Sequence, residues 1–406
     1  MESDEPCPVG SNAAATERRS PTAAARQIVN AVWEDLRWPI AIVLTSSLVL
    51  RLLAWTVAPG LADPLNDGWS ALFFLQISPF LVLVVAAWQR LVQHRSWSAM
   101  GSSGPLEPTR LCGLVLTLLL TRWIGANAIA WKYGLRQLHP FAYDVALRHL
   151  DHSLHGVSPW RLLKPFTSPT PLRVLDWCYT QWFPIFFMVM TWWGWAPRSP
   201  RRTRFLTAVT LTWILGYQIA VLLPAAGPVY FTRVTGQSGP YGELLRAIRA
   251  VPLTATWIQE ALWTNYVLPS GGLMKGIAAF PSLHVAMPVL YAVSSRTTVA
   301  RVIWWIYAGV IFVGSIVLGW HYAVDGYAAV LLVMGCWWLA CRIHESSSQP
   351  FDRPHRRGIV GEAVTAGRAT ACAGAHFGRQ SAPRPGQGTN PGRQRTDSLA
   401  HGPHSG

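Results

Sequence analysis

Apolar stretches of about 20 residues recur along this chain and constrain its fold more than any other feature. A helix of that length spans the hydrocarbon core of a bilayer, so each stretch predicts a transmembrane helix. We expect eight spans, at residues 38–58, 69–89, 111–131, 176–195, 204–223, 279–295, 301–317 and 322–342. Two have a weaker pattern, because the second contains Pro79 and the sixth is short. The predicted fold class is all-α, a polytopic bundle of about eight transmembrane helices.

The composition agrees with a membrane protein. Of 406 residues, 51% are hydrophobic and 13% are charged, against about 25% charged in an average soluble protein. The net charge of +15 is expected in loops and tails near anionic lipid. No recognition module accompanies this charge, so we expect no binding to nucleic acid. The six cysteines show no paired spacing that would indicate a disulfide framework or a zinc site.

Both ends of the chain are polar. Residues 1–36 lack the basic segment and short apolar core of a cleavable signal peptide, and we expect a disordered or loosely helical tail there. Residues 344–406 are rich in Ser, Pro, Gly, Gln and Arg and almost lack large apolar side chains. They cannot bury enough surface to fold, which predicts disorder. Residues 37–343 are then the membrane domain.

The arginines predict the orientation. Loops 90–110, 196–203 and 296–300 and the C-terminal tail are basic, and with eight spans they all fall on one side. The positive-inside rule makes that side cytoplasmic, together with both termini. The long loops 132–175 and 224–278 then face outward. The start of the sixth span and the turn between the last two spans also lie at this outer face.

The sixth span begins with the sequence PSLH, residues 281–284. Pro281 suits a first helical turn, and the N–H groups that follow it lack partners within the helix. A helix N-terminus of this kind favours an anion such as phosphate. Ser282 can add a hydroxyl donor, and His284 is placed to give a proton to a bound group. A plain helix cap with an interfacial histidine is the alternative.

The eighth span begins near the sequence HYAVD, residues 321–325. His321 and Asp325 are four residues apart, so a helix brings them to one face. A carboxylate that accepts one imidazole N–H makes the other nitrogen a better nucleophile or base. An aspartate within an apolar helix is costly without a partner, which favours this interpretation over a simple helix cap. Together the two motifs predict one outer site that contains His284, His321 and Asp325.

The two motifs, about 40 residues apart, resemble the type 2 phosphatidic acid phosphatase superfamily, whose members are lipid phosphatases and phosphotransferases that need no metal. YDVALRHLDHSLHG (143–156) and LLPAAGPVYF (222–231) resemble its branch that contains inositol phosphorylceramide synthase. The resemblance covers roughly residues 140–342 and implies a six-helix core without a cofactor. It implies that His321 attacks phosphorus to form a phosphohistidine, that Asp325 orients it, and that His284 protonates the leaving group. Water or an alcohol such as inositol then accepts the phosphoryl group.

The phosphate clamp of this superfamily is not present in its usual form. The Arg usually found six residues before the attacking His is Ser315 here, and the usual Lys followed seven residues later by Arg-Pro is not visible. Other groups must then bind phosphate. The expected ones are the helix start at Ser282 and the cations Arg233, Lys275 and Arg122. Arg122 could instead pair with Asp176 or Asp325 within the membrane.

Two outer segments have helical patterns of their own. Leu147, Leu150 and Leu154 share one face of residues 143–156, which predicts an interfacial helix, and residues 241–264 predict a second. Three histidines spread around the first helix without a typical ligand pattern, so we expect no metal there: His149, His152 and His155. The Pro and Gly of residues 224–228 either only end the fifth span or also bend the loop toward the site.

The sequence therefore predicts a multi-pass enzyme of the cell membrane. It would transfer or hydrolyse a phosphoryl group on a lipid phosphate or phospholipid, at an extracytoplasmic site. Hydrolysis of a phosphatidyl or polyprenyl phosphate is the alternative within enzymes. A transporter would need broken helices and a polar stripe through several spans, which we do not find. A haem protein with His284 and His321 as axial ligands would show a Soret band.

Overall fold

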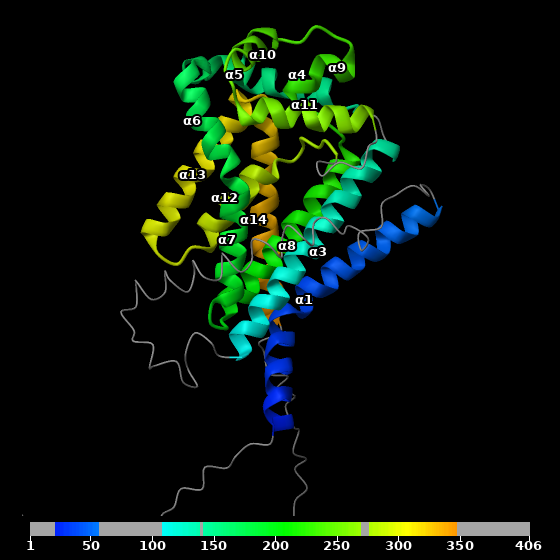
Figure 1. Cartoon of the computed structure of the whole chain (residues 1–406), viewed down its shortest axis with the longest axis vertical. Helices are drawn as coiled ribbons and strands as arrows, with labels where there is room; N and C mark the ends of the chain where they lie inside the picture. Colours follow the sequence, from blue (N-terminus) through cyan, green and yellow to red (C-terminus); the bar gives the residue numbers. More distant parts are fainter. Residues whose placement is uncertain (1–20, 57–107, 139–140, 269–275, 347–406) are drawn as a thin grey trace, which may run out of the picture. The chain divides into compact units, whose positions relative to one another are not determined.

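A computed structural model describes residues 21–56, 108–138, 141–268 and 276–346. Within these ranges the chain contains helices and no strand, which confirms the all-α prediction (Figure 1). Residues 1–351 group as one compact unit, and residues 352–406 lie outside the described ranges. Of the predicted C-terminal tail only residues 344–346 are described, and they continue the last helix.

Five helices are long and apolar enough to cross a membrane: α1 (Pro21–Thr56), α3 (Pro108–Leu138), α8 (Pro200–Leu222), α13 (Thr298–Val317) and α14 (Ala323–Ser346). They coincide with the first, third, fifth, seventh and eighth predicted spans. The predicted second span, 69–89, lies outside the described residues. Helix α1 begins at Pro21, inside the segment expected as a tail, and proline suits this first position because its missing N–H is not needed there.

The fourth and sixth predicted spans differ from expectation. Residues 176–195 belong to two helices, α6 (Pro169–Thr180) and α7 (Trp182–Trp195), and not to one. Pro184 has no N–H for the carbonyl of Thr180 and its ring crowds that carbonyl, so the helix breaks between them. The sixth span is the short helix α12 (Leu283–Ser294). At about 1.5 Å per residue its 12 residues cover only part of a hydrocarbon core of about 30 Å.

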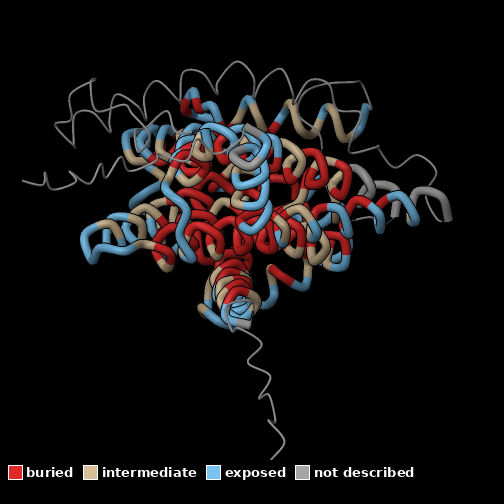
Figure 2. Tube along the Cα trace, turned by 90° about the horizontal axis from the view of Figure 1, so that it is seen from below, coloured by how far each residue is buried: buried red, intermediate tan, exposed pale blue. Residues whose placement is uncertain are grey.

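Helix α8 lies at the centre of the unit, in contact with α1, α3, α12 and α14. Figure 2 shows the buried positions on the inner sides of the helices and the exposed positions on their outer sides. The outer sides of α13 and α14 carry large apolar side chains such as Val299, Ile306 and Leu331. An outer surface of this kind suits helices whose outer sides face lipid.

Short helices gather at one end of the unit, around the start of α14 (Figure 1). They are α4 (Asp144–His155), α5 (Pro159–Leu162), α9 (Phe231–Thr235), α10 (Gly242–Arg249) and α11 (Thr254–Val267), with the 3-10 turns η2 (Lys164–Thr167) and η3 (Pro228–Tyr230). Helix α4 was predicted. The helix predicted at 241–264 is instead α10 and α11, because Pro252 disfavours helical backbone at the residue before it.

The basic residues meet at the other end. Arg201, at the start of α8, donates to the backbone carbonyls of Ser294 and Ser295 at 2.8 Å each, where α12 ends. Arg301, near the start of α13, donates to Ser295 at 3.3 Å. Cationic side chains stabilise the carbonyl end of a helix. Loops 196–203 and 296–300 therefore lie on the same side of the unit.

Candidate active site

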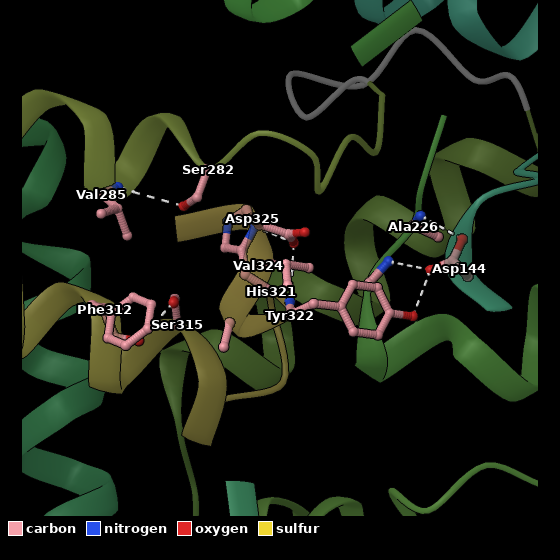
Figure 3. A network of polar contacts seen from close by, with 12 residues as sticks. Asp144, Ala226, Ser282, Val285, Phe312, Ser315, His321, Tyr322, Val324 and Asp325 are labelled. Carbon is pink, nitrogen blue, oxygen red and sulfur yellow. Dashed lines mark hydrogen bonds and ion pairs between the residues drawn. The ribbon is translucent and has the colours of Figure 1, made fainter. Parts of the chain in front are cut away.

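Two histidines and an aspartate from separate segments come together where the short helices gather. His284 is the second residue of α12, and its ring centroid lies 6.2 Å from that of His321, in the turn between α13 and α14. Nδ1 of His321 lies 3.3 Å from Oδ2 of Asp325, in the first turn of α14 (Figure 3). His321 is 6% exposed and Asp325 is fully buried, whereas His284 is only partly buried.

Ser282 joins the two motifs through its backbone. Its N–H donates to the carbonyl of Asp325 at 3.1 Å, and its side-chain oxygen accepts the N–H of Val285 at 3.4 Å as the N-cap of α12. Ser282 is buried, so these groups serve the protein's own structure, as in the helix-cap alternative. The N–H groups of Leu283 and His284 are the donors at this helix start that have no partner within the helix.

Ser315, at the position of the usual clamp arginine, shapes the turn that carries His321. Its carbonyl accepts the N–H groups of Trp320 and His321 at 2.9 and 3.1 Å. Its hydroxyl donates to the carbonyl of Phe312 within the same helix at 2.7 Å. Ser315 therefore positions the backbone before His321, and its side chain is turned to its own helix (Figure 3).

Helix α4 is joined to this turn by two buried aspartates that we did not predict as functional residues. Asp151 accepts the N–H groups of Ala323 and Val324 at 3.0 Å each, the two residues that precede Asp325. Asp144 accepts the hydroxyl of Tyr322 at 2.8 Å. Burial raises the pKa of both carboxyl groups, and these hydrogen bonds oppose that shift.

The buried face of α4 also differs from the expected one. Asp144, Leu147 and Asp151 are buried, whereas Leu150 and Leu154 are 46% and 59% exposed. These three buried residues are spaced as neighbours on one helical face. The spacing of the two aspartates could have indicated a shared face of the helix. An acidic face, however, gives no reason to expect burial until the backbone N–H groups that bind it are known.

The loop at residues 224–228 bends toward the site. Asp144 accepts the N–H groups of Ala226 and Gly227 at 2.9 and 2.8 Å. Gly227 has a φ of +99°, and a Cβ there would collide with the carbonyl of Trp320, next to His321. The carbonyl of Ala225 accepts the N–H of Ala279 at 2.8 Å, so the loop contacts both motif segments.

Lys132, near the end of α3, is a cation that acts electrostatically on both imidazoles. Its stem packs against Gly276, where a Cβ would lie 2.5 Å from the Lys132 Cβ, and its Nζ lies 5.3 Å from the ring centroid of Tyr217. We did not predict this residue. The signal was present, because Lys132 is followed seven residues later by His139-Pro140, which differs from the usual Lys and Arg-Pro motif only in one histidine.

One of the predicted phosphate-binding cations forms an ion pair away from the histidines, and another cannot be placed. Arg233 forms a two-point ion pair with Glu260 at 2.6 and 3.1 Å and lies over the ring of Trp263 at 5.1 Å. Its charge is therefore already matched by a carboxylate on α11. Lys275 lies outside the described residues.

Arg122 lies within α3 and is partly buried. The two aspartates considered as its partners make other contacts. Asp176 accepts the N–H groups of Thr254 and Ala255 at 2.8 Å each, and Asp325 faces the imidazole described above. Asp176 therefore caps α11, as a carboxylate does at a helix N-terminus.

The environment of His321 sets its charge. Burial lowers the pKa of the imidazole from 6.5 to about 4, and the positive charge of Lys132 acts in the same direction. The backbone carbonyl of Ala279 also lies within hydrogen-bonding reach of the ring and opposes the shift. The imidazole is therefore neutral at pH 7, which is the form with a nucleophilic lone pair.

The three histidines of α4 do not form a metal cluster. The ring nitrogens of His155 lie 2.7 Å from the carbonyl of Asp151 and 2.9 Å from the hydroxyl of Tyr327. Across residues 21–56, 108–138, 141–268 and 276–346, no group of three or more His, Cys, Asp or Glu side chains is arranged to hold a metal ion.

Residues 145–339 match the family model of the PAP2 superfamily, the type 2 phosphatidic acid phosphatases. The matched segment runs from α4 into α14 and includes both histidine motifs. This match indicates a phosphatase-type enzyme, and together with the long apolar helices it indicates a multi-pass membrane protein. Neither the curated proteins nor the solved structures gave a match to the chain.

Proposed function

We propose that this chain, whose residues 145–339 match the PAP2 superfamily, cleaves a phosphate ester of a membrane lipid through a phosphohistidine on His321. The observation that carries the proposal is the convergence of His284, His321 and Asp325, with 6.2 Å between the two ring centroids. A phosphoryl group between two imidazoles can be attacked by one and lose its leaving group to a proton from the other.

The first half of the reaction forms the covalent intermediate. A neutral His321 with its Nδ1–H donated to Asp325 has its lone pair on Nε2, which attacks phosphorus. The bond between phosphorus and the lipid oxygen breaks, its electron pair stays on that oxygen, and His284 supplies the proton. The carboxylate of Asp325 stabilises the positive charge that the substituted imidazole carries.

The second half reverses these roles. The oxygen of water or of an alcohol attacks phosphorus, and His284 accepts the proton that this oxygen loses. The bond between phosphorus and His321 breaks, and the ring becomes neutral again. Lys132, whose charge acts on His321, and the N–H groups at the start of α12 would bind the phosphoryl oxygens. Arg122 and Lys275 remain predicted contributors to this clamp.

The two ends of the unit support the proposed orientation in the membrane. The arginine-bearing starts of α8 and α13 meet at the end opposite the histidines, which the positive-inside rule assigns to the cytoplasm. The active site would then face the extracytoplasmic side of the cell membrane, and both termini would be cytoplasmic.

The acceptor distinguishes a phosphatase from a phosphotransferase. We favour transfer of a phosphorylated headgroup, such as inositol phosphate, because the clamp departs from that of the plain phosphatases; hydrolysis is the alternative. The test is to incubate the purified full chain with a panel of phospholipids, with and without inositol, and to resolve the products by mass spectrometry. A product in which the phosphorylated headgroup is joined to an acceptor alcohol would support transfer. Release of the headgroup phosphate, or of free phosphate from a lipid phosphomonoester, would support hydrolysis. No product from any lipid would contradict the proposal.

The acid limb of the pH profile is expected to lie well below that of an exposed histidine. Since His321 must be neutral to attack, and burial lowers its pKa to about 4, protonation of His321 should lower kcat/KM only near pH 4. An unperturbed imidazole would give a midpoint near about 6.5. The measurement is kcat/KM of the free enzyme against pH, and a midpoint of about 6.5 would contradict this environment for His321.

Loss of the Lys132 charge is expected to weaken substrate binding. A hydrogen bond to a charged group contributes about 1.5–3 kcal/mol, so Lys132→Ala should raise KM by roughly 10- to 100-fold. Lys132→Arg should recover part of this loss, because it keeps the positive charge. The control is Lys164→Ala, at an exposed lysine whose ion pair with Glu243 (2.8 Å) lies on the short helices. An unchanged KM in Lys132→Ala would show that other groups bind the phosphate.

A further inference from the structure

The imidazole of His284 is surrounded by aromatic rings of the segment where α6 meets α7. Tyr179 stacks nearly parallel on it, with 4.7 Å between centroids and 16° between planes. Trp182 lies at 4.5 Å with its plane tilted by 42°, and Phe183 presents an edge at 5.9 Å. We call Tyr179, Trp182 and Phe183 the aromatic cluster.

The aromatic cluster is fixed to its surroundings. Nε1 of Trp182 donates to the backbone carbonyl of His284 at 2.8 Å, and Trp182 is 2% exposed and stacked on Phe186 at 5.5 Å. Tyr179 is 8% exposed, and its ring lies parallel to that of Trp320, the neighbour of His321, at 6.2 Å. One row of rings therefore lies beside both histidines.

The ring of Tyr179, and not its hydroxyl, makes the contact with His284. Among the described residues the buried hydroxyl has no hydrogen-bond partner, whereas the ring face covers the imidazole. The π-face of an aromatic ring attracts a cation, most strongly where water is excluded. The ring of a proton donor must also not turn away from the leaving oxygen of the lipid phosphate.

We propose that the aromatic cluster holds the imidazole of His284 in the orientation needed to protonate the leaving alcohol, so that Tyr179 and Trp182 are positioning residues of the active site. This inference rests on the proposed function, since it assigns a role through the proton donor. The step concerned is the breaking of the bond between phosphorus and the leaving oxygen, in which that oxygen keeps the electron pair and takes the proton of His284.

The test compares two phosphate esters that differ only in their leaving group. An alkyl alcohol needs a proton as it leaves, whereas a nitrophenolate leaves without one, so a defect in proton donation affects only the alkyl ester. We expect Tyr179→Leu to lower kcat/KM, which reports formation of the phosphohistidine, by about 10- to 100-fold on the alkyl ester, at or below the lower end of the range for loss of a general acid. On the aryl ester kcat/KM should change by less than about threefold. Tyr179→Phe keeps the ring and should retain wild-type rates on both esters.

Further variants keep the test decisive. Trp182→Phe keeps an aromatic ring but removes the hydrogen bond to the His284 carbonyl, and it should give a smaller loss with the same preference for the aryl ester. The control is Phe205→Leu, at a buried aromatic residue of α8 that stacks on Trp193 at 4.6 Å; it should change both rates equally.

Three results would overturn the inference: an equal loss on both esters in Tyr179→Leu, no loss in that variant, or a loss in Tyr179→Phe as large as in Tyr179→Leu. A wild-type protein that cleaves neither ester would instead contradict the proposed function. If Tyr179→Leu does not fold, a Trp182→Phe variant with equal losses on both esters would overturn the inference in the same way.

Discussion

Turnover of a lipid phosphate is expected to fall by at least about 10³-fold in a His321→Ala variant, because the variant lacks the atom that forms the bond to phosphorus. The measurement is steady-state turnover combined with acid-free quenching and intact-protein mass spectrometry. Wild-type protein should carry a phosphoryl group during turnover, and the variant should carry none. The matched control is His152→Ala, at an exposed histidine of α4, which should keep wild-type activity.

The result for His284 should differ in kind. His284→Ala removes the proton donor but leaves the nucleophile, so it should lower kcat/KM, which reports formation of the phosphohistidine, on an alkyl ester and largely spare it on an aryl ester. Full activity in His321→Ala would exclude a phosphohistidine at this position. A phosphorylated His321→Ala protein would place the covalent intermediate on another residue.

The reacting groups could be predicted from the sequence because their signals are local. His321 and Asp325 are four residues apart, so any helix that begins at this point brings them together. PSLH before an apolar run likewise predicts a helix start with His284 in its first turn. Because successive spans cross the membrane in opposite directions, the predicted spans placed both motifs at its outer face. The structure brings the three side chains together.

The groups that support these residues could not be predicted in the same way. The role of Asp151 depends on α4 packing against the start of α14, and its contacts are to backbone N–H groups, which every residue has. The role of Asp144 likewise depends on a loop far along the chain. Lys132 did leave a signal in the sequence, but a motif with one altered residue is hard to recognise before its surroundings are known.

The fold likewise has features that the sequence predicts and one that it does not. Hydropathy located the five long helices, because a helix that crosses the hydrocarbon core needs a continuous apolar stretch of a fixed length. It failed at the predicted fourth span, where Pro184 breaks the helix and separates α6 from α7. The residues around this break form the aromatic cluster at His284. The span prediction therefore failed at a segment that contributes to the candidate active site.

Asp325→Asn is expected to lower kcat by about 10²- to 10⁴-fold with little change in KM, since the substitution removes a charge that acts only on the substituted imidazole. The variant should still fold. Oδ2 of Asp325 accepts the N–H of Tyr322 at 3.0 Å and faces His321, and the amide oxygen of Asn can take this place. The amide nitrogen would then take the place of Oδ1, which has no hydrogen-bond partner among the described residues.

The double variant gives the decisive measurement, because a group that acts only through His321 has nothing to act on once that imidazole is gone. Adding Asp325→Asn to His321→Ala should therefore cause no further loss of the residual activity, although each substitution alone is severe. Thermal unfolding of all three variants controls for loss of structure. Losses that multiply in the double variant would show that Asp325 acts on the substrate independently of His321, and its role as the orienting carboxylate would have to be abandoned.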